Sequence, residues 1–157
     1  MNEQALNAKF NKLLNKLFNE DSWEIRAEAA RNLGLLRDGR AINLLVRRLK
    51  TEENYVVINR IIEAMGRIGD ARATMSIIDY LKVELDKEEP DKKRLFFIIE
   101  SLLKLGDKRA LTHLGILHDS CEEDIKSLTE EALNCIDINW RENIMKYDDK
   151  EKTIEMK

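Results

Sequence analysis

The chain of 157 residues is 43% hydrophobic, 36% charged and only 6% aromatic, which suits one well-solvated domain with an aliphatic core. No apolar run approaches the roughly 20 residues of a membrane helix, and residues 1–4 lack the basic and apolar regions of a secretory signal, so a cytoplasmic protein without membrane contact is expected. The net charge of −3 combines +4 over residues 26–72 with −6 over residues 113–157, which argues against a uniform nucleic-acid-binding surface and is compatible with a basic face in the first half.

Apolar residues recur at spacings of three and four along most of the chain, which indicates amphipathic helices. The β-branched run 55–58 resembles a strand by itself. We assign it to a helix because Leu33, Met65 and Leu102 then occupy the same position of a repeat. In chain order, about eight helices are expected: an N-terminal capping helix over 1–20, helix-pair repeats over 22–52, 54–85 and 91–119, and a half-repeat with its cap over 122–147.

Two segments outside the helices are predicted to be polar and solvated. The charged stretch 86–93 contains the single proline and adds five residues to the period, which is typical of a loop. The polar tail 148–157 has too little apolar content to dock and is expected to be disordered. Between the last helix and this tail, Trp140, Ile144 and Met145 are expected to fold back as a cover.

A short turn motif recurs three times between paired helices. The segment 36–41 returns as 68–73 and as 105–110, with its aspartates 32 and 37 residues apart. We expect each aspartate to cap the helix that follows, each glycine before it to end the preceding helix, and each arginine to pair with a turn aspartate of an adjacent unit. The structural residues predicted for these turns are Asp38, Asp70, Asp107, Arg72, Arg109, Gly69 and Gly106.

The paired helices, the small pair Ala29–Ala30 and the repeated Gly-Asp-x-Arg-Ala turn resemble a HEAT-repeat protein, in particular the short HEAT-like repeat of phycobiliprotein (PBS) lyases. The resemblance covers roughly residues 22–136. It implies an all-α fold, an α-α superhelix formed as a short right-handed solenoid of antiparallel helix pairs. The same repeats occur in scaffolds, chromophore lyases, alkylpurine DNA glycosylases and a di-iron hydroxylase.

The residues that these enzymes need are largely missing from the sequence. His113 and His118 lie five residues apart, about 140° around a helix, and neither is followed by glutamate, so no metal site is expected. The sequence contains no phosphate-binding glycine loop and no recognisable nucleophile set, so neither catalytic residues nor a cofactor are expected. Cys121 and Cys135 are interpreted as free thiols, and Cys121 near a helix N-terminus is the residue that a lyase-type reading would use.

The second helix of each unit usually lines the concave side of such a solenoid, so residues beside the turn that do not recur are candidates for binding. Arg47 and Arg48 have no predicted structural partner, and the next unit carries Asp79 and Tyr80 in their place. A surface that varies while the turn stays constant is typical of a recognition face, although a plain solvated face is the alternative. The predicted partner-binding residues are Arg40, Asn43, Arg47, Arg48, Met75, Asp79, Tyr80 and Thr112.

These observations predict a non-enzymatic interaction module or scaffold that presents a partly basic helical surface to another protein with an acidic patch. The alternative is a subunit or chaperone of phycobilin-lyase-type cofactor attachment. DNA binding of the glycosylase kind ranks lower, because the pI is about 5.6 and because Asp79 interrupts the row of equivalent surface positions on the second helices. Two open solenoid ends predict a monomer or a weak homodimer.

Overall fold

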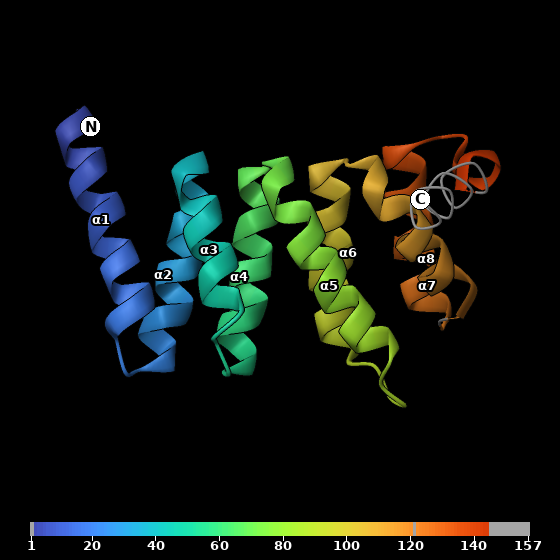
Figure 1. Ribbon diagram of the computed structural model, residues 1–157, viewed down its shortest axis with the longest axis horizontal. Helices are drawn as coiled ribbons and strands as arrows, with labels where there is room; N and C mark the ends of the chain where they lie inside the picture. The colour runs from blue at the N-terminus through green and yellow to red at the C-terminus, as the bar shows by residue number, and fades with distance from the viewer. Residues whose placement is uncertain (1, 121, 145–157) are drawn as a thin grey trace, which may run out of the picture. The chain divides into compact units, whose positions relative to one another are not determined.

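Figure 1 shows a computed structural model of the chain, which describes residues 2–120 and 122–144. Within these residues every regular element is a helix, which confirms the all-α prediction. None of the helices described is long and apolar enough to cross a membrane. Cys121, Met145 and the predicted disordered tail lie outside the described residues. The chain forms two compact units, Met1–Ser76 and Ile77–Lys157, and the single repeat domain over 1–147 stays a prediction.

The first unit follows the predicted order of a capping helix and helix pairs. Helix α2 packs on both α1 and α4, and α3 packs on α4. Asn2, Ser22 and Asn54 cap α1, α2 and α4 by accepting amide hydrogens of their first turns. The segment 55–58 is helical, as predicted. The elements are α1 (Glu3–Asn19), α2 (Trp23–Leu36), the 3-10 turn η1 (Gly39–Ala41), α3 (Ile42–Leu49), α4 (Tyr55–Ile68) and the 3-10 turn η2 (Ala71–Ala73).

The core of the first unit is aliphatic and tightly packed. Leu33 of α2 and Met65 of α4, which share one repeat position, are both fully buried. Between these helices, Gly34 lies so close to α4 that an added Cβ would stand 2.8 Å from Cα of Ala64. The absence of a side chain at this position therefore sets the spacing of the two helices.

The second unit begins within α5 and repeats the same pattern. Asp91 caps α6 by accepting the amide hydrogen of Arg94 at 2.8 Å. Helices α6 and α7 both pack on α8. Trp140 is buried and makes an edge contact with the ring of His118, with ring centres 5.4 Å apart. The elements are α5 (Thr74–Leu85), α6 (Lys92–Leu105), the 3-10 turn η3 (Lys108–Ala110), α7 (Leu111–Ser120), α8 (Glu123–Ile136) and a helical turn over 140–144.

A buried glutamate joins consecutive helices in the first unit. Glu52, after α3, accepts the amide hydrogen of Asn54, the N-cap of α4, at 3.1 Å. Its carboxylate also receives hydrogen bonds from Arg26 at 3.0 and 3.1 Å and from Arg48 at 2.8 and 3.1 Å. Arg26 in turn donates to the carbonyl oxygens of Glu20 and Asp21, between α1 and α2. One cluster therefore ties two interhelical connections together.

The pKa of Glu52 reflects this environment. Burial raises the pKa of the carboxyl, and the hydrogen bonds from Arg26, Arg48 and the Asn54 amide lower it further than burial raises it, to about 2. The carboxylate is therefore ionised in the folded protein at neutral pH. Two guanidinium groups depend on this one anion for their compensation.

Glu84 occupies the corresponding place 32 residues later, in the second unit. Its buried carboxylate accepts the amide hydrogen of Asp91, the N-cap of α6, at 3.1 Å. The ammonium group of Lys87 lies 2.6 Å away and the guanidinium of Arg94 3.9 Å away. The same residue type thus closes the connection between successive repeats in both units.

Substitution of Gly34 tests the close approach of α2 and α4. We expect Gly34→Ala to lower the free energy of unfolding by about 1 to 2 kcal/mol, because overpacking outweighs the higher helix propensity of alanine. Urea unfolding followed by circular dichroism measures the change. Gly39→Ala is the matched control, since its added Cβ would meet its nearest neighbours at 3.5 Å, an ordinary contact distance. Unchanged stability of Gly34→Ala would contradict the packing argument.

Substitution of Glu52 tests the buried ion cluster. We expect Glu52→Gln to lower the free energy of unfolding by about 2 to 3 kcal/mol at neutral pH, because two arginines lose their anion. The folded pKa of about 2 lies below the ordinary value of 4.5, so the stabilisation is present above 4.5 and is lost as the pH falls toward 2.

The difference between wild type and Glu52→Gln should therefore shrink across this acidic range in urea unfolding experiments. The exposed neighbour supplies the control, since Glu53→Gln should change stability by less than about 0.5 kcal/mol. A wild-type advantage over Glu52→Gln that stays constant from pH 7 to pH values near 2 would show that the ionised carboxylate contributes nothing.

Candidate interaction surface

Each recurrent turn is closed by its own aspartate and arginine. The carboxylates of Asp38, Asp70 and Asp107 accept the backbone amide hydrogen of the arginine two residues later, at 3.0, 2.9 and 3.0 Å. They also pair with its guanidinium at 2.6, 2.7 and 2.6 Å. The hydrogen bonds from Arg72 hold the pKa of Asp70 at about 2. The pairs therefore order each turn directly ahead of a second helix.

The helix before each turn ends in the left-handed conformation. Gly69 and Gly106 have φ values of 73° and 62°, the conformation expected of a C-terminal glycine. In the first turn this place is taken by Arg37, with a φ of 50°. All three turns thus share one backbone course despite the different residue in the first.

The prediction that the turn arginines pair with an aspartate of an adjacent repeat is wrong for Arg40 and Arg72. The spacing of two residues brings each guanidinium onto the carboxylate of its own turn. In the first unit the guanidinium groups of the turn arginines also bind residues earlier in the chain. Arg72 donates a hydrogen bond to the carbonyl oxygen of Gly39 at 3.0 Å, and Arg40 donates one to Oδ1 of Asn7 at 2.9 Å. Within the first unit, successive repeats are therefore linked through a backbone carbonyl and an amide side chain.

The first unit displays a basic stripe that runs along η1 and α3 to the residue after α3. We define it as Arg40, Asn43, Arg47 and Lys50. All four residues are exposed. The guanidinium carbon of Arg40 lies 4.6 Å from the ring centre of Phe10, and that of Arg47 lies 5.4 Å from the ring centre of Phe18.

Both rings of these cation–π contacts belong to α1. The rings orient the two guanidinium groups. The guanidinium of Arg40 also pairs with the Asp38 carboxylate at 2.6 Å. Among the described residues, neither Arg47 nor Lys50 forms an ion pair. The stripe therefore presents exposed positive charge on a supported helix.

Arg48 does not belong to this surface, which corrects the prediction that it lacks a structural partner. Its side chain is only 19% exposed and pairs with Glu52 at 2.8 Å, four residues along the chain. The adjacent Arg47 points elsewhere because successive residues on a helix differ by about 100° in direction. Of the two neighbouring arginines, one supports the fold and one faces solvent.

The remaining predicted residues are dispersed. Met75 is exposed at the start of α5, in the first unit. In the second unit Asp79 is exposed, whereas Tyr80 is half-buried with the guanidinium carbon of Arg94 at 5.7 Å from its ring centre. Thr112 is half-buried on α7 and lines a hollow beside Trp140. Only Arg40, Asn43 and Arg47 are brought onto one stripe.

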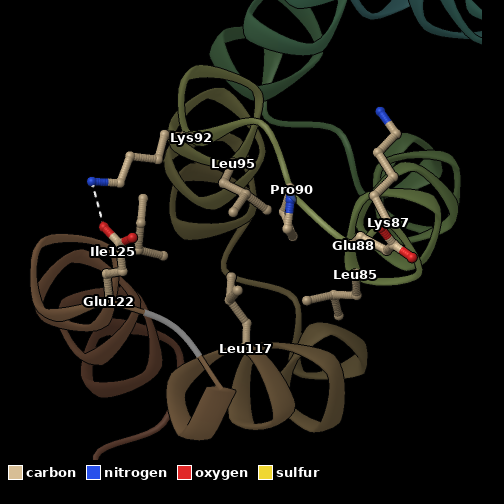
Figure 2. Close-up of a pocket in the computed structure, with 9 residues that line it drawn as sticks. All are labelled: Leu85, Lys87, Glu88, Pro90, Lys92, Leu95, Leu117, Glu122 and Ile125. Atoms are coloured by element: carbon tan, nitrogen blue, oxygen red, sulfur yellow. Dashed lines mark ion pairs between the residues drawn. The ribbon is translucent and has the colours of Figure 1, made fainter.

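Sequence reasoning missed a pocket of about 350 Å³ in the second unit. Figure 2 shows its apolar side chains pointing toward a common space, while Lys92 at the rim pairs with Glu122 at 2.6 Å. The signal was present as a comparison between repeats, since positions that are charged in the first unit are aliphatic here. The apolar lining consists of Leu85, Pro90, Leu95, Leu117 and Ile125.

The groups able to carry other chemistry are few in the described part of the chain. No cluster of three or more His, Cys, Asp or Glu residues suited to a metal ion occurs there. His118 is buried, with its ring nitrogens 3.2 Å from Asp119 of the same helix and 3.3 Å from Glu130, and the second contact connects α7 with α8. Cys135 is an exposed free thiol.

Comparison with protein families supplies one match. Residues 10–89 match the model for HEAT repeats, which is just over half of the 157-residue chain. The matched region runs from α1 through α5 and includes the basic stripe and the first two recurrent turns. Comparison with curated proteins gives no match. By its repeated helix pairs and this family match, the chain belongs to the HEAT-repeat family.

Proposed function

We propose that this chain is a non-enzymatic protein–protein interaction module whose basic stripe binds an acidic segment of a partner protein. HEAT repeats generally mediate protein–protein interaction. The observation that carries the specific proposal is the exposure of Arg47 and Lys50 beside Arg40. Among the described residues, no carboxylate forms an ion pair with Arg47 or Lys50. Such charges attract carboxylates at long range and fix the register of a complex.

The physical arrangement of the stripe also favours recognition over a merely solvated face. Contact with Phe10 and Phe18 restricts Arg40 and Arg47 before any partner arrives. A side chain that is already oriented loses less conformational entropy on binding. The Gly-Asp-x-Arg-Ala turn supports a structural relation to the short repeat of phycobiliprotein lyases, and we propose this relation for the repeat alone.

Charge reversal on the stripe tests the proposal. We expect Arg47→Glu to weaken capture of acidic partners from the native cell by about tenfold or more, because an attraction becomes a repulsion. Wild-type binding should weaken as salt rises from about 0.05 to 0.3 M. Quantitative mass spectrometry of the captured proteins, followed by calorimetry with the purified partner, measures both effects.

The control is Arg31→Glu, which reverses an exposed arginine on α2, outside the stripe. It makes the same change in net charge and should leave partner capture intact. Equal loss for the two variants would indicate a nonspecific charge effect. Full retention of the same partners by Arg47→Glu at low salt would remove the basic stripe as the binding surface.

A further inference from the structure

The apolar pocket of the second unit occupies the same position in the repeat as a polar hollow in the first unit. The turn aspartates Asp38 and Asp107 are 69 residues apart. The same offset relates Arg26 to Leu95 and Arg48 to Leu117. In the first unit these positions line a polar hollow with Glu52, and in the second they line the pocket of Figure 2.

The chemical content of the two sites is opposite. In the first unit the hollow, of about 540 Å³, is lined by the guanidinium groups of Arg26 and Arg48, which are hydrogen-bonded around the Glu52 carboxylate. In the second unit leucines stand at the two positions of these arginines. Their side chains are shorter and form no hydrogen bonds. The counterpart of Glu52 is a cysteine in the sequence and lies outside the described residues. At these positions a charged lining has therefore become an apolar one.

The dimensions of the pocket suit one large side chain. Its floor is made by Leu95, Leu117 and Ile125, each buried, with the half-buried Leu85 as one wall. Pro90, in the loop between α5 and α6, is exposed at the edge. A volume of about 350 Å³ exceeds what one water molecule needs, and removing apolar floor area from water is favourable.

The charged residues that line the pocket itself are two lysines and two glutamates, whereas the adjoining loop and helix start carry excess negative charge. The loop before α6 and the first turn of α8 contribute six exposed carboxylates, against three amines from the same loop and the start of α6. Lys87 pairs with the buried Glu84 at 2.6 Å, and Lys92 pairs with both Glu122 at 2.6 Å and Asp124 at 3.0 Å, so the excess charge comes from the other four carboxylates. The carboxylates are Asp86, Glu88, Glu89, Glu122, Glu123 and Asp124, and the amines are Lys87, Lys92 and Lys93.

We propose that this pocket is a second binding site, which takes one aliphatic or aromatic side chain of a partner protein flanked by lysine or arginine residues. The apolar side chain of the partner enters the pocket, and the basic residues beside it pair with carboxylates around the mouth. The chain thus carries two recognition sites of opposite charge, one in each unit. This site does not depend on the basic stripe.

A peptide titration tests the site directly. The probe is the peptide Lys-Ser-Lys-Leu-Lys-Ser-Lys with blocked ends, added to the full chain with isotope-labelled methyl groups. We expect a Kd of about 100 μM and methyl shifts at Leu95, Leu117 and Ile125. Replacing the central leucine of the peptide by serine, or its four lysines by glutamates, should each weaken binding by about tenfold or more.

Two variants of the protein locate the binding to the pocket. Leu85→Trp fills the space and should weaken binding by about tenfold, whereas the matched control Val83→Trp adds the same ring at an exposed position of α5 outside the pocket and should not. Glu88→Lys reverses charge at the rim without touching the core and should weaken binding several-fold. Circular dichroism verifies that each variant is folded.

The proposal is overturned if the leucine and serine peptides bind equally, if the acidic peptide binds as well as the basic one, or if Glu88→Lys binds like wild type. Absence of methyl shifts at millimolar peptide would overturn it as well. Arg47→Glu should leave this titration unchanged. A result against the pocket therefore leaves the basic stripe untouched, and the converse also holds.

Discussion

The carboxylate of each turn aspartate, hydrogen-bonded to the arginine two residues later, sets the start of every second helix, and both candidate surfaces depend on that start. In the first unit it determines which residues of α3 point away from α4 and form the basic stripe. In the second unit the corresponding turn, with Asp107, sets the direction of α7 and so carries Leu117 into the floor of the pocket. A pair that contributes little stability at an exposed site still determines geometry, because it orders the backbone where the chain reverses.

The junction between successive repeats shows how one backbone position supports different chemistry. Glu52 and Glu84 both receive the amide hydrogen of the next N-cap residue, so this backbone contact is common to the two units. The side chains around it differ. Arg26 and Arg48 compensate Glu52 fully, whereas 69 residues after each of these arginines the chain has leucine. A buried charge needs a complete set of hydrogen-bonding and oppositely charged partners. Such a cluster is therefore either present as a whole or replaced as a whole by apolar residues.

Much of the architecture was predictable from local patterns. The apolar spacing, the capping residues and the recurring turn located the helices, because each signal acts within a few residues of the bond that it predicts. The partner of Arg48, Glu52, lies only four residues along the chain, a spacing at which such pairs are common; what the local pattern did not show is that Glu52 is buried and also binds Arg26 of α2. The turn arginines were assigned to a neighbouring aspartate for the related reason that spacing alone does not give side-chain direction.

The amino-acid sequence by itself determined the all-α class, the repeat period, the turn residues and the uneven charge, since these follow from composition and from interactions between residues close in the chain. Only the tertiary structure decided which charges are exposed. It separated Arg47 from Arg48, placed Phe10 and Phe18 against the arginines of the basic stripe, and assembled an apolar pocket from four helices and a loop of the second unit. The physical reason is that burial is a property of packed helices, and residues distant in sequence supply both the partner of a charge and the walls of a cavity.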